Sequence, residues 1–130
     1  MRLYTLEEAR AMLPAVLPVL SGIAELVREL RTMQAAMSVD MRGASGDGAL
    51  TANPWAETHK DRGDELTRLL QEAVARLEQW GVELKDPDRG LIDFHHERDG
   101  EVVYLCYMLG EPDIEYWHPL ETGYAGRQRV

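Results

Sequence analysis

The sequence predicts an α+β fold, in which a long antiparallel helical hairpin is followed by a small antiparallel three-stranded β-meander. Two observations lead to this prediction. Apolar side chains recur at steps of three and four residues before residue 38 and after residue 54, as on the buried face of a helix. After Gly81 the apolar residues alternate, and Asp99-Gly100 is a strong signal for a β-hairpin turn. We expect a single domain over residues 1–130, with the helical hairpin in 5–80 and the meander and tail in 81–130.

The first helix is expected to begin at Thr5, because Thr5-Leu-Glu-Glu8 has the pattern of a capping box. Pro14 and Pro18 lack the backbone amide that a helix interior requires. We therefore expect a short helical arm that ends near Leu13, then a bend, then a longer helix that continues to about residue 37.

A linker and a second helix are expected next. Residues 38–54 contain three glycines and are expected to form a flexible linker. Its glycine-rich stretch 43–48 fits neither the P-loop nor the dinucleotide-binding pattern, since no strand precedes it and no GK[ST] follows. The second helix is expected over 55–80, with Gly81 as its C-terminal cap. The expected apolar stripes are Leu17, Leu20, Ala24, Val27, Leu30, Gln34 and Met37 on the first helix and Leu66, Leu69, Leu70, Ala73, Leu77 and Trp80 on the second.

The three predicted strands cover residues 91–97, 102–109 and 114–118, with 82–84 as a brief further candidate. If Asp99-Gly100 is a two-residue turn, His95 faces Tyr104 and Asp93 faces Cys106. One face of the hairpin is then an apolar core face, which carries Ile92, Phe94, Val103, Leu105 and Tyr107. The opposite face carries Asp93, His95, Tyr104, Cys106 and Met108, so a site on the sheet would lie on this second face.

The charge distribution excludes some partners. The chain has a net charge of −9, and residues 81–121 hold eleven acidic against three basic side chains. Such a field repels phosphate groups, so we expect no nucleic-acid partner and no membrane partner. The N-terminus lacks the apolar segment of a signal peptide, and no run approaches the roughly 18 apolar residues of a membrane span. The single cysteine, Cys106, excludes an internal disulfide, and together these features predict a cytoplasmic protein.

Two kinds of chemistry are conceivable on the polar sheet face. Asp93, His95 and Cys106 could act as orienter, base and nucleophile, but the acidic surroundings do not favour a thiolate. Packing is the better interpretation of Cys106, so no catalytic residue is assigned. No cofactor is predicted either. A divalent metal ion is the alternative, with ligands among His118, Glu121, Asp93 and His95; His95 and His96 point to opposite faces and cannot share an ion.

The tail, EYWHPLETGYAGRQRV, is unusually rich in aromatic and charged residues. In a structural interpretation, Arg127 pairs with a nearby carboxylate such as Glu111, Glu115 or Glu121, and Tyr124 seals the core. In a functional interpretation the tail forms the rim of a pocket for a small polar ligand. The candidate ligand-binding residues are Glu111, Trp117, His118, Glu121, Tyr124 and Arg127.

Several motifs resemble one bacterial family of uncharacterised proteins, the domain-of-unknown-function family numbered 2203. They are YTLEEA with LP near the N-terminus, GVELKD, RGLIDF, EVVYLCY, LGEPDIEYWH and GYAGRQ, which span the chain outside the linker. The resemblance implies a small cytoplasmic protein with a helical hairpin and a compact C-terminal unit, and it brings no established activity. The family pattern has a proline after Asp-Phe where this chain has His95, which favours the tail over His95 as the site.

Two functions remain as hypotheses. The first is a homo-oligomeric interaction or scaffold module without catalytic activity, which forms a homodimer through its long helices. The second is a small-ligand- or divalent-metal-binding protein, or an enzyme, that uses the Trp-His…Glu…Arg motif of the tail.

Overall fold

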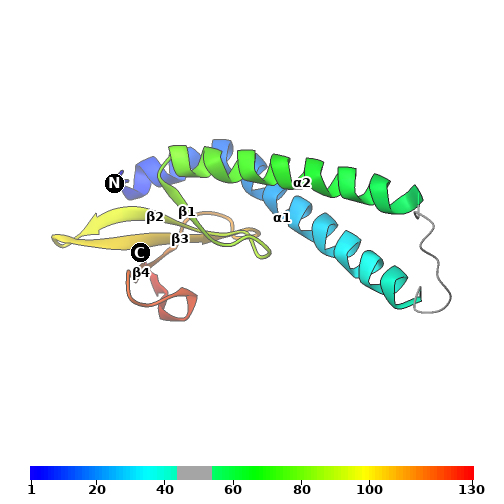
Figure 1. Ribbon diagram of the computed structural model, residues 1–130. Helices are drawn as coiled ribbons and strands as arrows, with labels where there is room; N and C mark the ends of the chain where they lie inside the picture. Colours follow the sequence, from blue (N-terminus) through cyan, green and yellow to red (C-terminus); the bar gives the residue numbers. More distant parts are fainter. Residues whose placement is uncertain (44–53) are drawn as a thin grey trace.

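The computed structural model describes residues 1–43 and 54–130, and the side chains of 1–36 and 60–130. Two long helices precede a five-stranded antiparallel sheet, so the α+β class is confirmed (Figure 1). The sheet order, β1-β2-β3-β4-β5, is the order of the strands along the chain. The elements are α1 (Leu6–Gly43), α2 (Pro54–Gln79), β1 (Val82–Asp86), β2 (Leu91–Arg98), β3 (Glu101–Met108), β4 (Tyr116–Pro119), the 3₁₀ turn η1 (Tyr124–Gly126) and β5 (Gln128–Arg129).

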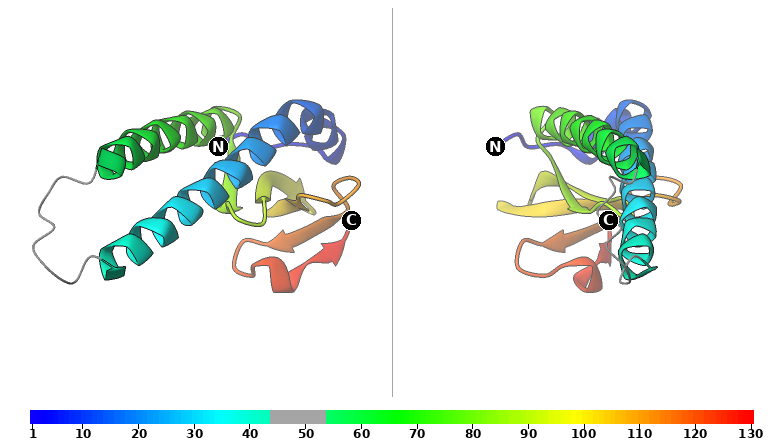
Figure 2. Two further views of the ribbon diagram at one scale, coloured as in Figure 1. Left: turned by 90° about the vertical axis from the view of Figure 1, so that its right-hand side faces the viewer. Right: turned by 45° about the vertical axis from the view of Figure 1, so that its right-hand side comes forward.

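The helices cover one face of the sheet, and the segment between β4 and β5 lies on the other side (Figures 1 and 2). The predicted register of the β2–β3 hairpin is confirmed: Asp93 lies opposite Cys106 and His95 opposite Tyr104. The core fills the space between helices and sheet. Its buried members are Tyr4, Ala9, Leu13, Val16, Leu20, Ile23, Leu77, Val82, Ile92, Phe94, Leu105, Tyr107 and Ile114.

The three-stranded meander is wrong in its strand number. The segment after Gly81 forms a full edge strand, β1, which pairs with β2 and has an irregularity between Leu84 and Asp86. At the other edge, the two residues of β5 pair with Tyr116 and Trp117 of β4. The alternation signal missed β5 because two residues are too few to show a period.

The predicted bend after Leu13 is also wrong, because α1 continues through Pro14 and Pro18. Both prolines are exposed, so water can reach the carbonyl groups that lose their helical amide partners. Their neighbours on the other side of the helix, such as Val16, are buried in the core and hold the helix in place. The capping box is confirmed: the Thr5 amide donates to Glu8 Oε1 at 2.9 Å, and the Glu8 amide donates to Thr5 Oγ1 at 3.0 Å.

The predicted linker begins too early, since α1 extends to Gly43. The rest of that linker, 44–53, and most of the glycine-rich stretch 43–48 lie outside the described residues. The side that α1 buries also differs from the predicted stripe, because the helix packs against the sheet as well as against α2. Its buried side chains are Ala9, Leu13, Val16, Leu20, Ile23 and Ala24, whereas Leu17, Val27 and Leu30 are half-buried and Gln34 is exposed.

One described segment, Leu6–Ala36, is long and apolar enough to cross a membrane by length and composition, with a mean hydropathy of 1.5 in its most apolar window. The expectation that no segment reaches this level is therefore wrong. Helices in the cores of soluble proteins meet the same criterion, and this helix contributes Leu13, Val16 and Leu20 to the core.

Gly90 fixes the turn between β1 and β2. Its φ is +67°, and a Cβ at this position would overlap the Leu109 side chain. Gly90→Ala is expected to lower the free energy of unfolding by about 2 kcal/mol, because backbone strain and steric overlap add. Gly100→Ala is the matched control, since Gly100 has φ +81° and open space around its Cβ direction. Urea denaturation of both variants checks this; equal losses would show that the overlap with Leu109 costs nothing.

Candidate functional site

The outer face of the sheet, away from the helices, carries two rows of polar side chains. Strand register places Glu83, Asp93, Cys106 and Tyr116 side by side across β1 to β4. In the next row, His95, Tyr104 and His118 are neighbours across β2, β3 and β4. Residues 120–127 then return across this face, and Asp93, Cys106 and His118 are almost completely buried.

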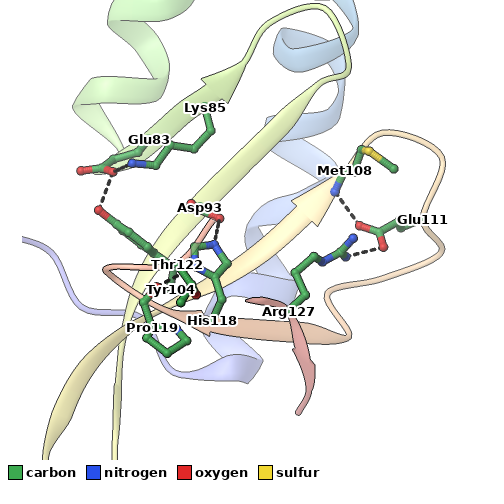
Figure 3. A network of polar contacts seen from close by, with 10 residues as sticks. All are labelled: Glu83, Lys85, Asp93, Tyr104, Met108, Glu111, His118, Pro119, Thr122 and Arg127. Atoms are coloured by element: carbon green, nitrogen blue, oxygen red, sulfur yellow. Dashed lines mark hydrogen bonds and ion pairs between the residues drawn. The ribbon is translucent and has the colours of Figure 1, made fainter. Parts of the chain in front are cut away.

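Asp93 and His118 form a buried pair at the centre of this face (Figure 3). His118 Nε2 lies 3.1 Å from Asp93 Oδ1, and the two side chains are only 3% and 2% exposed. The other ring nitrogen, Nδ1, lies 2.8 Å from the Pro119 carbonyl oxygen, which can only accept. Nδ1 is therefore the donor in this contact, and Nε2 is the ring nitrogen that faces the Asp93 carboxyl group.

Burial raises the pKa of the Asp93 carboxyl, and the neighbouring His118 and Cys106 offset only part of that rise. Removal of a carboxylate from water is costly unless a positive or hydrogen-bonding group compensates it. His118 supplies part of that compensation, because it lowers the pKa of Asp93 through its charge and through a hydrogen bond.

Cys106 lies in the same cluster and is completely buried. Burial, reinforced by the negative charge of Asp93, raises the pKa of its thiol to about 12. His95, the base in the predicted cysteine-hydrolase arrangement, lies instead 3.5 Å from Glu83 and beside the Tyr104 ring. The histidine that meets Asp93 is His118, and the charge of Arg127, which favours the Cys106 thiolate, is outweighed by burial and by Asp93.

This pKa predicts that Cys106 is inert in the native protein. Relative to an ordinary thiol, its thiolate population at neutral pH is lower by about 1,000-fold, and its burial slows reagents further. Labelling by a disulfide reagent should therefore be slower by at least about 1,000-fold in buffer than in urea. Stopped-flow absorbance measures both rates. Native labelling as fast as in urea would contradict this account of the cluster.

A cavity of about 280 Å³ opens above the Asp93–His118 pair. Lys85 lies at its edge, where Nζ donates to Glu83 Oε2 at 2.7 Å and lies 4.7 Å from the centre of the Tyr104 ring. The Tyr104 hydroxyl donates to the same Glu83 oxygen at 2.7 Å. The residues that line the cavity are Lys85, Leu91, Asp93, Tyr104, His118, Leu120, Glu121, Thr122, Gly123 and Tyr124.

The structure separates the six residues of the predicted tail site. His118, Glu121 and Tyr124 line the cavity. Trp117 belongs to the opposite face of the sheet, where it packs against the core and lies under the Arg98 guanidinium. The remaining two, Glu111 and Arg127, form an ion pair with each other.

The Arg127–Glu111 pair fastens the tail to the sheet (Figure 3). The Arg127 guanidinium donates to Glu111, whose other carboxylate oxygen accepts the Met108 amide at 2.6 Å. The same guanidinium lies 3.9 Å from the centre of the Tyr116 ring and 4.7 Å from that of Tyr124. These contacts support the interpretation in which Arg127 stabilises the fold by pairing with a carboxylate of its own chain, rather than binding a ligand.

Sequence reasoning missed Lys85 and Tyr104 as cavity residues and Cys106 as a neighbour of His118. Tyr104 was correctly placed on the polar face, but only the β3–β4 register, Tyr104 opposite His118, shows that the histidine joins it. No local signal marks Lys85, which reaches the site from the irregular end of β1.

Comparison with known proteins places the chain in a family and gives no activity. No curated protein and no solved structure matches it. A family model described as "Uncharacterized conserved protein (DUF2203)" matches residues 2–130, which is essentially the whole chain. The chain therefore belongs to the family of uncharacterized conserved proteins DUF2203.

Proposed function

We propose that this protein binds a small, positively charged ligand in the cavity above Asp93 and His118. The observation that carries the proposal is a buried, hydrogen-bonded carboxylate–imidazole pair at the floor of an open cavity of about 280 Å³. Buried ionisable groups that converge on a cavity are typical of binding sites. A buried ion pair usually stabilises a protein less than apolar side chains of similar size would, so stability alone does not explain its presence.

The charge of the cavity favours a cation. Asp93 lies at the floor, and the exposed Glu121 lies at the mouth. Lys85 is the only lysine or arginine among the described lining residues, and its charge is already compensated by Glu83. The surrounding segment, 81–121, has a net charge of −8, which raises the local concentration of cations.

The walls of the cavity suit a cation with a short apolar body. The Tyr104 ring already accepts one ammonium group, that of Lys85, and the Tyr124 ring accepts the guanidinium of Arg127. Leu91 and Leu120 supply apolar wall. A small amine could replace Lys85 at Tyr104 or bind between the aromatic wall and Glu121.

A calorimetric titration tests the proposal with two probes of equal carbon number, the diamine putrescine and the dicarboxylate succinate. We expect putrescine to bind and succinate not to bind. Glu121→Gln should lower the affinity for putrescine by about 3- to 10-fold, a modest loss because Glu121 is exposed and its charge is screened by water. Asp93→Asn should lower the affinity further. Asp61→Asn, an exposed site on α2, is the control and should change nothing. Succinate binding as tight as that of putrescine, or no binding of any cation, would refute the proposal.

The long helices support a second candidate function, homo-oligomerisation. Only 28% of the most apolar window in Leu6–Ala36 is buried within the chain. Leu26, Leu30 and Leu69 are half-exposed and lie outside the core cluster, so a second copy could cover them. Light scattering at micromolar concentration tests this: we expect a dimer that Leu26→Glu dissociates and that Gln71→Glu, an exposed change on α2, leaves intact. A monomeric wild-type protein would exclude it.

A further inference from the structure

We propose that the floor of this cavity also binds a transition-metal ion, for which Zn²⁺ is the best fit, through Asp93, Cys106 and His118. The inference rests on the proposed function, that the cavity above the sheet holds a cation. It goes further by naming the ion class and the three side chains that would hold it.

Three adjacent strands bring the potential ligand atoms together. Asp93 and Cys106 are directly opposite each other on β2 and β3, and His118 comes from β4. One carboxylate oxygen, the thiol sulfur and one imidazole nitrogen all lie within 4.8 Å of one another. In a tetrahedral zinc site, bond lengths of about 2.0–2.3 Å place ligand atoms about 3.3–3.7 Å apart. The site needs contraction on the order of 1 Å, which side-chain rotation can supply.

The orientation of His118 is that of a metal-binding histidine. Nδ1 donates its proton to the Pro119 carbonyl oxygen at 2.8 Å, so Nε2 is the nitrogen left to bind a ligand. Metal-bound histidines usually have this second hydrogen bond to a carbonyl or carboxylate, because it fixes the tautomer and the ring plane. In the described structure, Nε2 points at Asp93 Oδ1, the second proposed ligand.

The donor set selects among metals. One oxygen, one nitrogen and one sulfur suit Zn²⁺, whereas Mg²⁺ and Ca²⁺ require oxygen ligands. Three protein ligands leave a fourth tetrahedral position open. Asp93 and His118 line the cavity and Cys106 does not, so we expect the open position to face the cavity.

Cys106 would bind the ion as a thiolate, so the bond between its sulfur and the ion forms as the S–H bond breaks and the proton passes to solvent. Asp93 would bind as a carboxylate, and His118 through Nε2 with its proton on Nδ1. A proton that lies between Nε2 and Asp93 before the ion binds passes to solvent in the same step.

The experiment uses the full chain, purified without a polyhistidine tag and freed of metal by a chelator. After addition of Zn²⁺, native mass spectrometry should show one ion per chain. Co²⁺ should give the near-ultraviolet charge-transfer band of a cobalt–thiolate bond and the strong visible bands of a tetrahedral site. Cys106→Ser should abolish the charge-transfer band. His118→Gln should lower the affinity for Zn²⁺ by more than about 100-fold, which exceeds the loss expected when a residue that only hydrogen-bonds to a ligand is replaced. Circular dichroism verifies that each variant is folded.

His95→Gln is the matched control, because His95 lies on the same face but contacts Glu83 and the Tyr104 ring. We expect it to bind zinc as the wild type does. Failure to bind one Zn²⁺ per chain at pH 8, or unchanged zinc affinity in both Cys106→Ser and His118→Gln, would overturn the metal site. Putrescine binding without zinc binding would overturn this inference and leave the proposed function standing, whereas failure of both probes would overturn both.

Discussion

Replacing His118 with alanine is expected to lower the free energy of unfolding by about 3–5 kcal/mol at neutral pH. The variant leaves the Asp93 carboxylate buried without its partner, in a position that is only 2% exposed. Such a charge must either remain uncompensated or take up a proton, and both outcomes cost stability. Urea denaturation measures the loss, and we expect it to be smaller at pH 4 than at pH 7, because protonated Asp93 needs no positive partner.

A double-mutant cycle separates the pair from the packing of the ring. Asp93→Asn in the His118→Ala background removes the stranded charge and should restore part of the lost stability. If the double variant is less stable than His118→Ala by the full cost of Asp93→Asn alone, the two side chains do not interact and the pair contributes nothing.

The second large effect is expected at the Arg127–Glu111 ion pair. Arg127→Ala should lower the free energy of unfolding by about 2 kcal/mol. The half-buried carboxylate of Glu111 loses its ion-pair partner, and the Tyr116 and Tyr124 rings lose their contact with the guanidinium. The tail should also loosen, so that Cys106 reacts faster with a disulfide reagent in native buffer. Denaturation and thiol labelling measure the two effects on the same sample.

Arg129→Ala is the control for this result. Arg129 is 75% exposed, and its contact with Glu115 spans 3.9 Å, so its loss should change the stability by no more than about 0.5 kcal/mol. Equal effects of the two substitutions would show that general charge balance, and not the buried contact of Arg127, holds the tail.

The sequence was informative where local chemistry determines geometry. Asp99 and Gly100 both have positive φ, as a tight hairpin turn requires, and that turn alone fixes the opposition of Asp93 and Cys106. At Pro14 and Pro18 the local sequence predicted a bend that the structure does not have. The cost of a proline in a helix depends on whether water reaches the carbonyl groups that lose their amide partners. That accessibility is a property of the folded chain and cannot be seen in the sequence pattern.

The candidate site could be predicted only in part, for a similar reason. The connection between β3 and β4 runs through Gly110 and Pro112 in irregular conformation, so no turn type fixes the register of the next strand. A shift of one residue would put Trp117 on the polar face and His118 in the core. The observed register makes His118 the partner of Asp93, and Arg127 reaches Glu111 only because the tail folds back.

The agreement between strand order in the sheet and strand order in the chain has a kinetic consequence. Each strand pairs with the one just before it, so the sheet can grow by successive local additions, which favours fast formation. Asp93 and Cys106 come together when the first tight hairpin closes, but His118 arrives only when β4 docks. The proposed ligand atoms are therefore assembled late, and a probe of the site would report that the C-terminal third of the chain has reached its native state.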